Sequence, residues 1–332
     1  MACNPNKSLK DLSEDLGINY WTLYKTVERM RRVGIFREIT IPNFRMLGYE
    51  LFVVGYGNLT KKKVTEIQKV RDSGSLKGFS ANIFYGLAES YRGFVMGTAK
   101  NYTDVKRTLV AAERVIRLRE VMGSDVKIVL LPFELTKIPL LFDFSRLLCR
   151  EIHVNCNCTH GMSDPRINRR LSSRERQILY ELTKNPNISL SELSERVGVT
   201  IQTASKIKNR LYDEGWLLRR IIPDLSLLDY EVLVFAHWNM NPDAVSLVED
   251  MNPEGIDISN IIFLAYDILE GIAVAPFKNL KESREIISFF EQFGAASSVL
   301  VGEPRILFLS LQESIKIRDH DYAPLLTDFI SN

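Results

Sequence analysis

The sequence has few of the residues from which most catalytic and metal sites are built. Its 332 residues include only four cysteines and four histidines. It contains no glycine-rich phosphate loop and no metalloprotease motif, and no nucleophile stands with a recognisable base and acid. We therefore expect a protein that is not an enzyme.

Long apolar stretches are lacking too. No run approaches the roughly 18 apolar residues that indicate a membrane span, and no N-terminal stretch resembles a signal peptide. We expect a soluble, cytoplasmic protein with no membrane partner. Its length and its hydrophobic content of 45% are sufficient for two or more packed domains.

A strong excess of one charge is also absent, because the formal net charge is only +2 at pH 7. Basic residues are nevertheless concentrated between Lys206 and Arg220. A local cluster of positive charge, rather than the total, is the electrostatic signature of a surface that binds nucleic acid.

This cluster lies in a segment, Ser189 to Ile222, with the pattern of a winged helix-turn-helix. Ser189 and Glu192 form a capping box at a helix start, and Gly198 ends that helix at a tight turn. A second helix should begin at Thr200 and read DNA, and a basic two-stranded wing should follow it. The residues that we expect to contact DNA here are Thr200, Gln202, Thr203, Ser205, Lys206, Lys208, Asn209, Arg210, Arg219 and Arg220.

A helical hairpin with solvated charges is the alternative, since helix-turn-helix patterns are loose. In either case the apolar stripe of the second helix should be buried. This stripe consists of Ala204, Ile207 and Leu211.

The segment from Ser8 to Gly48 repeats this pattern 181 positions earlier, without a gap. The turn glycines Gly17 and Gly198 are in register, and so are Pro42 and Pro223 after the two wings. A register of this length is more specific than either motif alone, and it indicates an internal duplication.

The duplication continues beyond the wings. Each half shows short β-branched and aromatic runs alternating with helical segments, in the order β-α-β-β-α-β of a ferredoxin-like sandwich. We expect helices near 61–73 and 103–118, and terminal helices that begin at Pro139 and Pro324. The fold class is therefore α+β, a tandem duplication in which a winged helix-turn-helix precedes a ferredoxin-like sandwich in each half.

The predicted domains follow from this order. They are a winged helix that lacks its first helix (1–48), a ferredoxin-like domain with a terminal helix (49–150), a linker containing Cys and His (151–168), a second winged helix (169–228) and a second ferredoxin-like domain with a terminal helix (229–332).

This order resembles the leucine-responsive/asparagine regulator (Lrp/AsnC) family. The resemblance lies in L-S-S-R-E-R-Q-I-L-Y-E-L (171–182), in the L-S-E-R-V-G turn (193–198), and in the N-R-L-Y-D-E-G helix end (209–215) with the wing and proline that follow. It implies a sequence-specific transcription regulator that binds double-stranded DNA, dimerises through its sandwich sheets and binds a small-molecule effector between them. We expect a homodimer.

Two alternatives stay open. Fused tandem proteins similar to this family include sirohaem decarboxylases, in which histidines and arginines surround a tetrapyrrole. The other alternative is an oligomerising scaffold that has lost DNA binding. Of the histidines, His237 resembles an ordinary strand-end residue and His320 a solvated turn residue.

The two copies differ in one respect. The second has a helix before its helix-turn-helix, capped at Ser172, whereas the counterpart in the first copy falls before residue 1. We expect Trp21 and Tyr24 to cover the resulting gap or to pack on a partner. The basic residues of the first reader helix that we expect to contact DNA are Lys25, Arg29 and Arg32.

Three of the four cysteines and two of the four histidines fall in the short stretch between the halves. Thiolate and imidazole groups are ligands for zinc and other soft metals, and clustered thiols are also redox-active. A solvated linker is the alternative. The candidate metal ligands are Cys149, His153, Cys156, Cys158 and His160.

Overall fold

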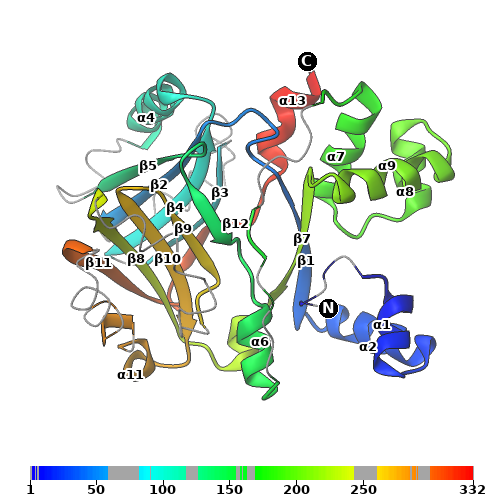
Figure 1. Ribbon diagram of the computed structural model, residues 1–332, viewed down its shortest axis with the longest axis horizontal. Helices are drawn as coiled ribbons and strands as arrows, with labels where there is room; N and C mark the ends of the chain where they lie inside the picture. The colour runs from blue at the N-terminus through cyan, green and yellow to red at the C-terminus, as the bar shows by residue number, and fades with distance from the viewer. Residues whose placement is uncertain are drawn as a thin grey trace.

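The computed structural model describes residues 2–331 apart from residues 4, 6, 59–81, 90, 117–125, 155–157, 159, 163–168, 243–259, 285, 289 and 291–299. Two winged-helix regions lie on one side of the molecule, and two β-sheets lie on the other (Figure 1). Within the described residues, no helix is long and apolar enough to cross a membrane.

The winged-helix regions repeat the same local structure. The first contains α1 (Leu9–Leu16), α2 (Tyr20–Arg32) and strand β1 (Phe36–Pro42). The second contains α7 (Ser173–Lys184), α8 (Leu190–Val197), α9 (Ile201–Asp213) and strand β7 (Leu217–Pro223).

Local sequence signals account for these helix ends. The side chains of Ser8 and Ser189 accept hydrogen bonds from the backbone three residues on, which satisfies an otherwise unpaired N–H group. Gly17 and Gly198 end α1 and α8 with φ angles of 62° and 68°, a left-handed conformation that glycine adopts without steric cost. The predicted starts and turns of these helices are confirmed, although only half of the capping box predicted at Ser189 is present, because the Glu192 carboxylate pairs with Arg196.

The predicted two-stranded wings are wrong. Each half contributes one strand, and β1 pairs antiparallel with β7 of the other half. Ile39 lies opposite Arg220, its own counterpart in the repeat, so the ribbon has a pseudo-twofold axis at this pair. A strand without a hairpin turn has to find its backbone partners elsewhere, and the duplicated copy supplies them.

The two sheets have five strands each. The first sheet has the order β12-β3-β4-β2-β5, and the second has the equivalent order β11-β8-β10-β9-β6. The strands of the first half are β2 (Leu51–Asn58), β3 (Ile83–Ala88), β4 (Arg92–Ala99), β5 (Lys127–Pro132) and β6 (Lys137–Leu140). Those of the second half are β8 (Val232–Met240), β9 (Phe263–Tyr266), β10 (Glu270–Phe277), β11 (Leu300–Ser310) and β12 (Ile315–Asp319).

Within each half, four strands have the ferredoxin-like arrangement that the sequence predicts. The helix expected over 103–118 is α4 (Tyr102–Ile116), and in the second half α11 (Leu280–Ser283) follows β10 as α4 follows β4. The helix predicted near 61–73 lies outside the described residues. The tandem fold class is confirmed.

The fifth strand of each sheet comes from the opposite half. Strand β6 pairs with β9, and β12 pairs with β3. The prediction that a helix begins at Pro139 is wrong, because this residue lies in β6, and the helix α6 (Ser145–Glu151) follows later. After β12, the 3₁₀ helix η5 (Ala323–Leu326) leads into α13 (Thr327–Ser331). A second 3₁₀ helix, η2 (Leu225–Leu228), follows β7.

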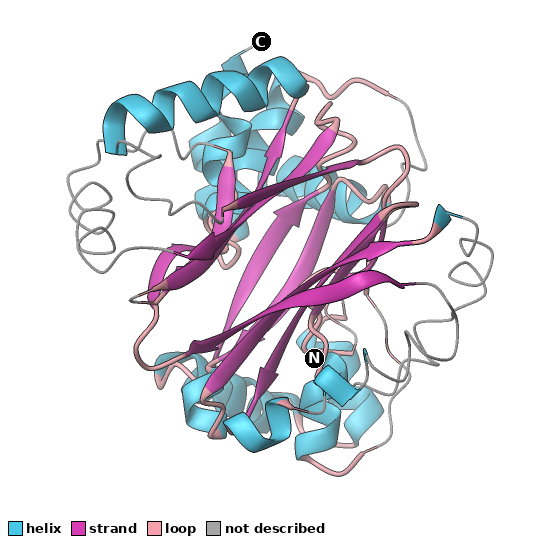
Figure 2. Ribbon diagram, turned by 90° about the vertical axis from the view of Figure 1, so that its left-hand side faces the viewer, coloured by secondary structure: helices cyan, strands magenta, loops and turns pink. Residues whose placement is uncertain are grey.

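The sheets pack face to face, as Figure 2 shows. Aromatic side chains meet across the interface: the ring centroids of Phe52 and Phe263 are 5.5 Å apart, and those of Phe94 and Phe235 are 4.8 Å apart. All four side chains are buried. Full burial of one such ring contributes about 1.5–3 kcal/mol, so this aromatic layer is a major stabilising part of the molecule.

The chain turns sharply after each exchanged strand. Phe142 and His320 both have positive φ angles, 48° and 55°, and their rings meet edge to face with centroids 4.4 Å apart. His320 also stacks on Tyr85, and burial lowers its pKa to about 3. The prediction that His320 is solvated is therefore wrong, because strand exchange carries this turn into the core.

Candidate nucleic-acid interface

The exposed face of α9 carries the residues best placed to reach a bound nucleic acid. Gln202, Thr203, Lys206 and Asn209 are exposed and follow one another at helical spacing. Thr200 caps the helix, its hydroxyl accepting a hydrogen bond of 3.2 Å from the Thr203 N–H. Ser205 is half-buried.

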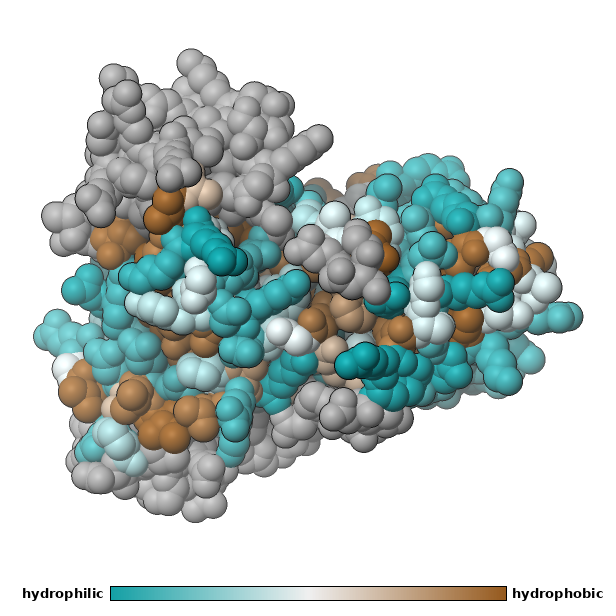
Figure 3. Space-filling model, turned by 90° about the horizontal axis from the view of Figure 1, so that it is seen from above, coloured by the Kyte–Doolittle hydropathy of each residue, from teal (hydrophilic) through white to brown (hydrophobic). Residues whose placement is uncertain are grey.

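The opposite face of α9 is buried as predicted. Ala204, Ile207 and Leu211 pack in the main core with residues of α7 and α8. The N-terminal half of α9 is therefore held by a three-helix core with its polar side chains outward. On the lobe formed by α7, α8 and α9, at the right of Figure 3, hydrophilic and apolar residues are interspersed.

Arg220 was predicted to contact DNA, and this prediction is wrong. Arg220 is only 5% exposed, and it lies on the side of the β1–β7 ribbon that faces the sheets. Nε donates 2.9 Å to the Leu141 carbonyl, and Nη2 donates 2.7 Å to the His160 carbonyl and 3.2 Å to that of Gly161. Burial lowers the pKa of Arg220 to about 10. Its role is to hold the ends of β6 and of the linker.

Arg219 and Lys208 are directed toward the ribbon rather than outward. The Arg219 guanidinium lies over the Tyr212 ring, 5.5 Å from its centroid, and its Nε is 3.8 Å from a Glu38 carboxylate oxygen. Lys208 is half-buried, and burial, together with the neighbouring Arg219 charge, lowers its pKa. These two cations are less available to phosphate than their sequence positions indicate.

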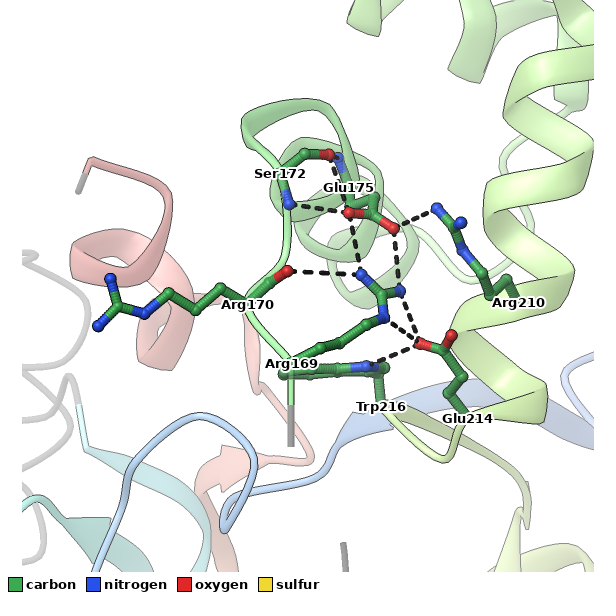
Figure 4. A network of polar contacts seen from close by, with 7 residues as sticks. All are labelled: Arg169, Arg170, Ser172, Glu175, Arg210, Glu214 and Trp216. Carbon is green, nitrogen blue, oxygen red and sulfur yellow. Dashed lines mark hydrogen bonds and ion pairs between the residues drawn. The ribbon is translucent and has the colours of Figure 1, made fainter. Parts of the chain in front are cut away.

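Arg210 belongs to a network of ion pairs that joins α7 to α9 (Figure 4). Its guanidinium contacts Glu175, the capping-box residue of α7. Arg169 also binds this carboxylate, at 3.0 Å, and the Glu214 carboxylate at 2.6 Å. The Trp216 indole N–H donates 3.1 Å to Glu214. No local pattern in the sequence indicates this role of Arg169, because its partners lie 6 and 45 positions away.

The Glu175 side chain is only 5% exposed. Burial by itself would raise its pKa, but hydrogen bonds from Arg169 and Ser172 outweigh this effect and lower the pKa to about 2. The carboxylate is therefore charged at neutral pH and fixes the position of α9 relative to α7.

The first winged-helix region presents a different surface. Lys25, Arg29 and Arg32 are exposed on α2. Arg29 is the counterpart of Arg210 in the repeat, yet it makes no ion pair within the described part of the chain. In the second copy the corresponding arginine contacts Glu175 of α7, whose counterpart at the same offset would fall before residue 1.

Trp21 and Tyr24 are exposed on α2. Trp21 is 65% exposed, and it packs edge-on against Tyr24 and against Tyr20. The small core of this region consists of Val27, Phe36 and Ile221, and Ala2 from the N-terminal segment packs against it. Because these rings are exposed, the expectation that they are covered within this chain is wrong, and packing on a partner stays a prediction.

The candidate metal ligands of the linker that the structure describes have different surroundings. The His160 ring lies 3.1 Å from the buried Asp143 carboxylate, and His153 is exposed in a left-handed turn. Cys149 is buried and disulfide-bonded, Cys158 is a free thiol, and Cys156 lies outside the described residues. Among the residues that the structure describes, no group of three or more His, Cys, Asp or Glu side chains is arranged to hold a metal ion.

A second polar cluster lies between the sheets. Tyr56 and His237 are counterparts in the repeat and meet across the interface, with the hydroxyl 3.0 Å from Nδ1. The other ring nitrogen of His237 is 3.3 Å from Glu270, which also binds Lys127 at 2.9 Å. The hydrogen bond from His237 and the Lys127 charge lower the pKa of Glu270 against the effect of its burial. Because His237 is 1% exposed, it is not the ordinary strand-end residue that the sequence indicates.

Residues 171–217 match a family model described as winged helix-turn-helix DNA-binding. No curated protein sequence matches the chain. Two solved structures of the siroheme decarboxylase NirDL, one with an iron-uroporphyrin III analogue, align with 97% of this chain and 92% of theirs. Their TM-scores are 0.56 and 0.55, at 14% and 15% identity. A Neisseria meningitidis transcriptional regulator in complex with L-Met aligns with 42% of this chain at 14% identity and a TM-score of 0.32.

These matches correct one expectation from the sequence. The chain was predicted not to be an enzyme, and that prediction is wrong, because the structures that share its fold over nearly the whole length belong to an enzyme. At this level of identity the likeness shows the fold, and the activity has to be argued from side chains.

We predict that the Glu175 network makes stability depend on pH. Since the folded-state pKa is about 2 and the ordinary value is 4.5, the contribution is fully present above pH 4.5 and is lost as the pH falls toward 2. Glu175→Gln should destabilise the wild-type protein by about 2–3 kcal/mol at pH 7 and flatten this acid dependence. The measurement is urea unfolding between pH 2.5 and 7.

Glu192→Gln is the matched control. Glu192 pairs with Arg196 at 2.7 Å, but its side chain is 46% exposed, so its loss should cost at most about 1 kcal/mol. Equal destabilisation by the two variants would contradict the role assigned to the Glu175 network.

Proposed function

We propose that this chain is a sequence-specific DNA-binding regulator of transcription, with the N-terminal half of α9 as its reader. The observation that carries the proposal is the outward polar face of a helix held in a three-helix core. In addition, the match of residues 171–217 to a DNA-binding winged-helix family supports it.

The side chains on this face have complementary uses. The Gln202 amide is able to pair with an adenine edge in the major groove, and the hydroxyls of Thr200 and Thr203 are able to bind bases or phosphates. Lys206 is exposed and makes no ion pair within the described part of the chain, so it is the cation on this face free to bind phosphate. Ser205 and Asn209 extend the polar surface.

The first winged-helix region contributes positive charge in this proposal. Lys25 is the counterpart of Lys206, and it lies on α2 with Arg29 and Arg32. Pairing of β1 with β7 connects the two readers rigidly. We therefore expect phosphate contacts from both regions and base readout from α9.

Lys206→Ala should lower DNA affinity several-fold on every sequence and reduce the slope of log K against log salt by about one. Gln202→Ala should instead change sequence preference. The measurement is a salt titration on fragments selected from genomic DNA by the purified protein.

Arg210→Ala is the control, because Arg210 is bound to Glu175 rather than free. It should change the salt slope less than Lys206→Ala, when both are measured below their unfolding temperatures. An unchanged affinity and slope for Lys206→Ala would overturn the assignment of α9 as the reader.

We further propose that the chain forms a homodimer with four winged-helix units. The sheets of one chain already cover each other's inner faces, so association has to use other surfaces. Strand β11 is an edge strand of its sheet, and Val301 on it is 52% exposed. Exposed edges of this kind pair readily with another chain unless they are protected. Binding of a small-molecule effector by the sandwich domains stays a prediction.

Light scattering at micromolar concentration should give twice the chain mass of 38.1 kDa. Val301→Lys should shift the protein toward the monomer, because a charge on the edge opposes pairing. Val33→Lys, at a side chain that is 64% exposed in the first winged-helix region, is the control. A wild-type mass of 38.1 kDa would contradict the dimer.

A second candidate function is decarboxylation of an iron tetrapyrrole. The NirDL structures share the fold, and the His237 cluster supplies an imidazole, a phenol and a carboxylate between the sheets. Burial raises the pKa of Tyr56 to about 12, so its hydroxyl is a proton donor at neutral pH. These three groups are suited to proton transfer. Decarboxylation requires a proton transfer, because the carboxyl group is replaced by hydrogen.

If this function is present, the absorption spectrum of iron-uroporphyrin III should change on addition of the protein. The change should weaken for His237→Ala and persist for His153→Ala, whose side chain is exposed. Incubation with siroheme should then release CO2, measured as mass loss of the tetrapyrrole. No spectral change and no mass loss would exclude this function while leaving the DNA proposal intact.

A further inference from the structure

Three aromatic side chains lie together on the surface at the start of α2. Tyr20, Trp21 and Tyr24 are all exposed. The Trp21 ring meets the other two edge to face, with centroids 5.4 Å and 6.0 Å away, and the two tyrosine rings stack with centroids 6.2 Å apart. A contiguous apolar group of this kind, open to water, is typical of a surface that binds another molecule.

Cations follow these rings along the same helix. They are Lys25, Arg29 and Arg32, which are exposed and make no ion pair within the described part of the chain. Trp21, Lys25 and Arg32 are separated by four and seven residues, so they lie on one side of α2 over roughly 16 Å. Glu28 is the carboxylate on that side, and Arg31 binds it. We call the three rings and the three cations the α2 surface.

The equivalent positions of α9 carry side chains of another kind. The counterparts of Trp21 and Tyr24 are Gln202 and Ser205, whereas Lys25 corresponds to a lysine in both copies. Amide and hydroxyl groups suit the base edges in the groove of a duplex. Aromatic faces instead suit stacking on unpaired bases, which tolerates any sequence because every base has a π-face. The two helices are therefore fitted to different forms of a nucleic acid.

We propose that the α2 surface binds single-stranded DNA. In this arrangement the rings stack on unpaired bases, and the cations that follow pair with phosphates of the same strand. The choice of DNA over RNA rests on the proposed function of α9, because the β1–β7 ribbon connects the two helices and a DNA molecule held by α9 would supply the strand.

A second copy of this chain is the alternative occupant. Leu16 and Ile18, which immediately precede α2, are exposed too and would add apolar area to a protein contact. In a twofold contact, however, the same surface lies on both sides. Lys25, Arg29 and Arg32 would then face their own copies, and like charges repel. A polyanionic strand neutralises these charges instead, so the charge of the surface favours DNA.

The test uses the fluorescence of the full chain with an oligothymidylate of about 12 nucleotides, a length within the usual range of single-strand sites. Of the three tryptophans, Trp21 is exposed and Trp216 and Trp238 are buried. Stacking of a base should therefore quench the emission of Trp21 selectively. The affinity is measured in parallel, by the polarisation of a dye attached to the strand.

Two substitutions separate stacking from a general apolar contact. Trp21→Ala should lower the affinity roughly five- to 150-fold, the usual effect of removing one stacking ring. Trp21→Phe keeps a ring, so it should retain most of the affinity while the change in emission is lost. Arg32→Ala should reduce the slope of log K against log salt by about 0.7, the value for one phosphate of a single strand.

Tyr102→Ala is the matched control. Tyr102 is an exposed aromatic residue at the start of α4, but Lys106 lies over its ring, 5.2 Å from the centroid, so this face is already occupied. Its replacement should leave the affinity for oligothymidylate unchanged. Both Trp21 and Tyr102 are exposed, so neither substitution removes a core side chain, and circular dichroism checks that the variants are folded.

Three results would overturn the proposal. They are an unquenched Trp21 at saturating oligothymidylate, an emission change that rises with protein concentration alone, which would assign the surface to a contact between copies, and tighter binding of oligouridylate, which would assign it to RNA. Oligothymidylate forms no duplex, so its binding is independent of duplex reading by α9. The Lys206→Ala titration described above therefore succeeds or fails separately.

Discussion

The antiparallel pairing of β1 with β7 is the constraint on which the rest of the molecule depends. Each strand has unpaired backbone N–H and C=O groups that only the other half satisfies. One face of the ribbon carries Phe36 and Ile221 toward α2, and the other carries Ile41 and Arg220 toward the sheets. The winged-helix regions are consequently fixed to the sandwich and to each other by the same seven-residue pairing.

Strand exchange reinforces this arrangement. Because β6 and β12 each complete the sheet of the other half, neither half has a full sheet without its partner. The turns that follow carry Phe142 and His320 into contact at the centre. Buried Arg220 then needs backbone carbonyls as partners, because an unpaired charge there would be costly, and the ends of β6 and the linker provide them. The two halves of the duplication are thus joined by exchanged strands as well as by the ribbon.

The two copies differ in the partners of equivalent arginines. In the second copy, Glu175 binds Arg169 and Arg210, so part of its positive charge stabilises the helix bundle. In the first, Arg29 makes no ion pair with the described residues and is exposed. The same fold also occurs in an enzyme, and the cluster around His237 shows that polar chemistry is present between the sheets. The fold therefore does not distinguish DNA binding from catalysis, and the function has to be inferred from individual side chains.

Local signals in the sequence determined much of this protein. Capping residues such as Ser189 and turn glycines such as Gly198 predicted the helices, because helix ends depend on backbone preferences within a few residues. The constant offset between the copies predicted the duplication and, with it, the same order of ferredoxin-like strands in both halves. Periodicity likewise predicted the buried stripe of α9 at Ala204, Ile207 and Leu211.

Only the tertiary structure decided how the copies combine. The pairing of β1 with β7, the exchange of β6 and β12, the burial of Arg220 and His320, and the contact of Cys3 with Cys149 all join residues that lie far apart in the sequence, 79 positions apart for Arg220 and Leu141 and 146 for Cys3 and Cys149. Such contacts depend on packing and backbone hydrogen bonding between the halves. The pattern of residues within one segment does not indicate which charged side chain will be solvated and which will be buried against a backbone carbonyl.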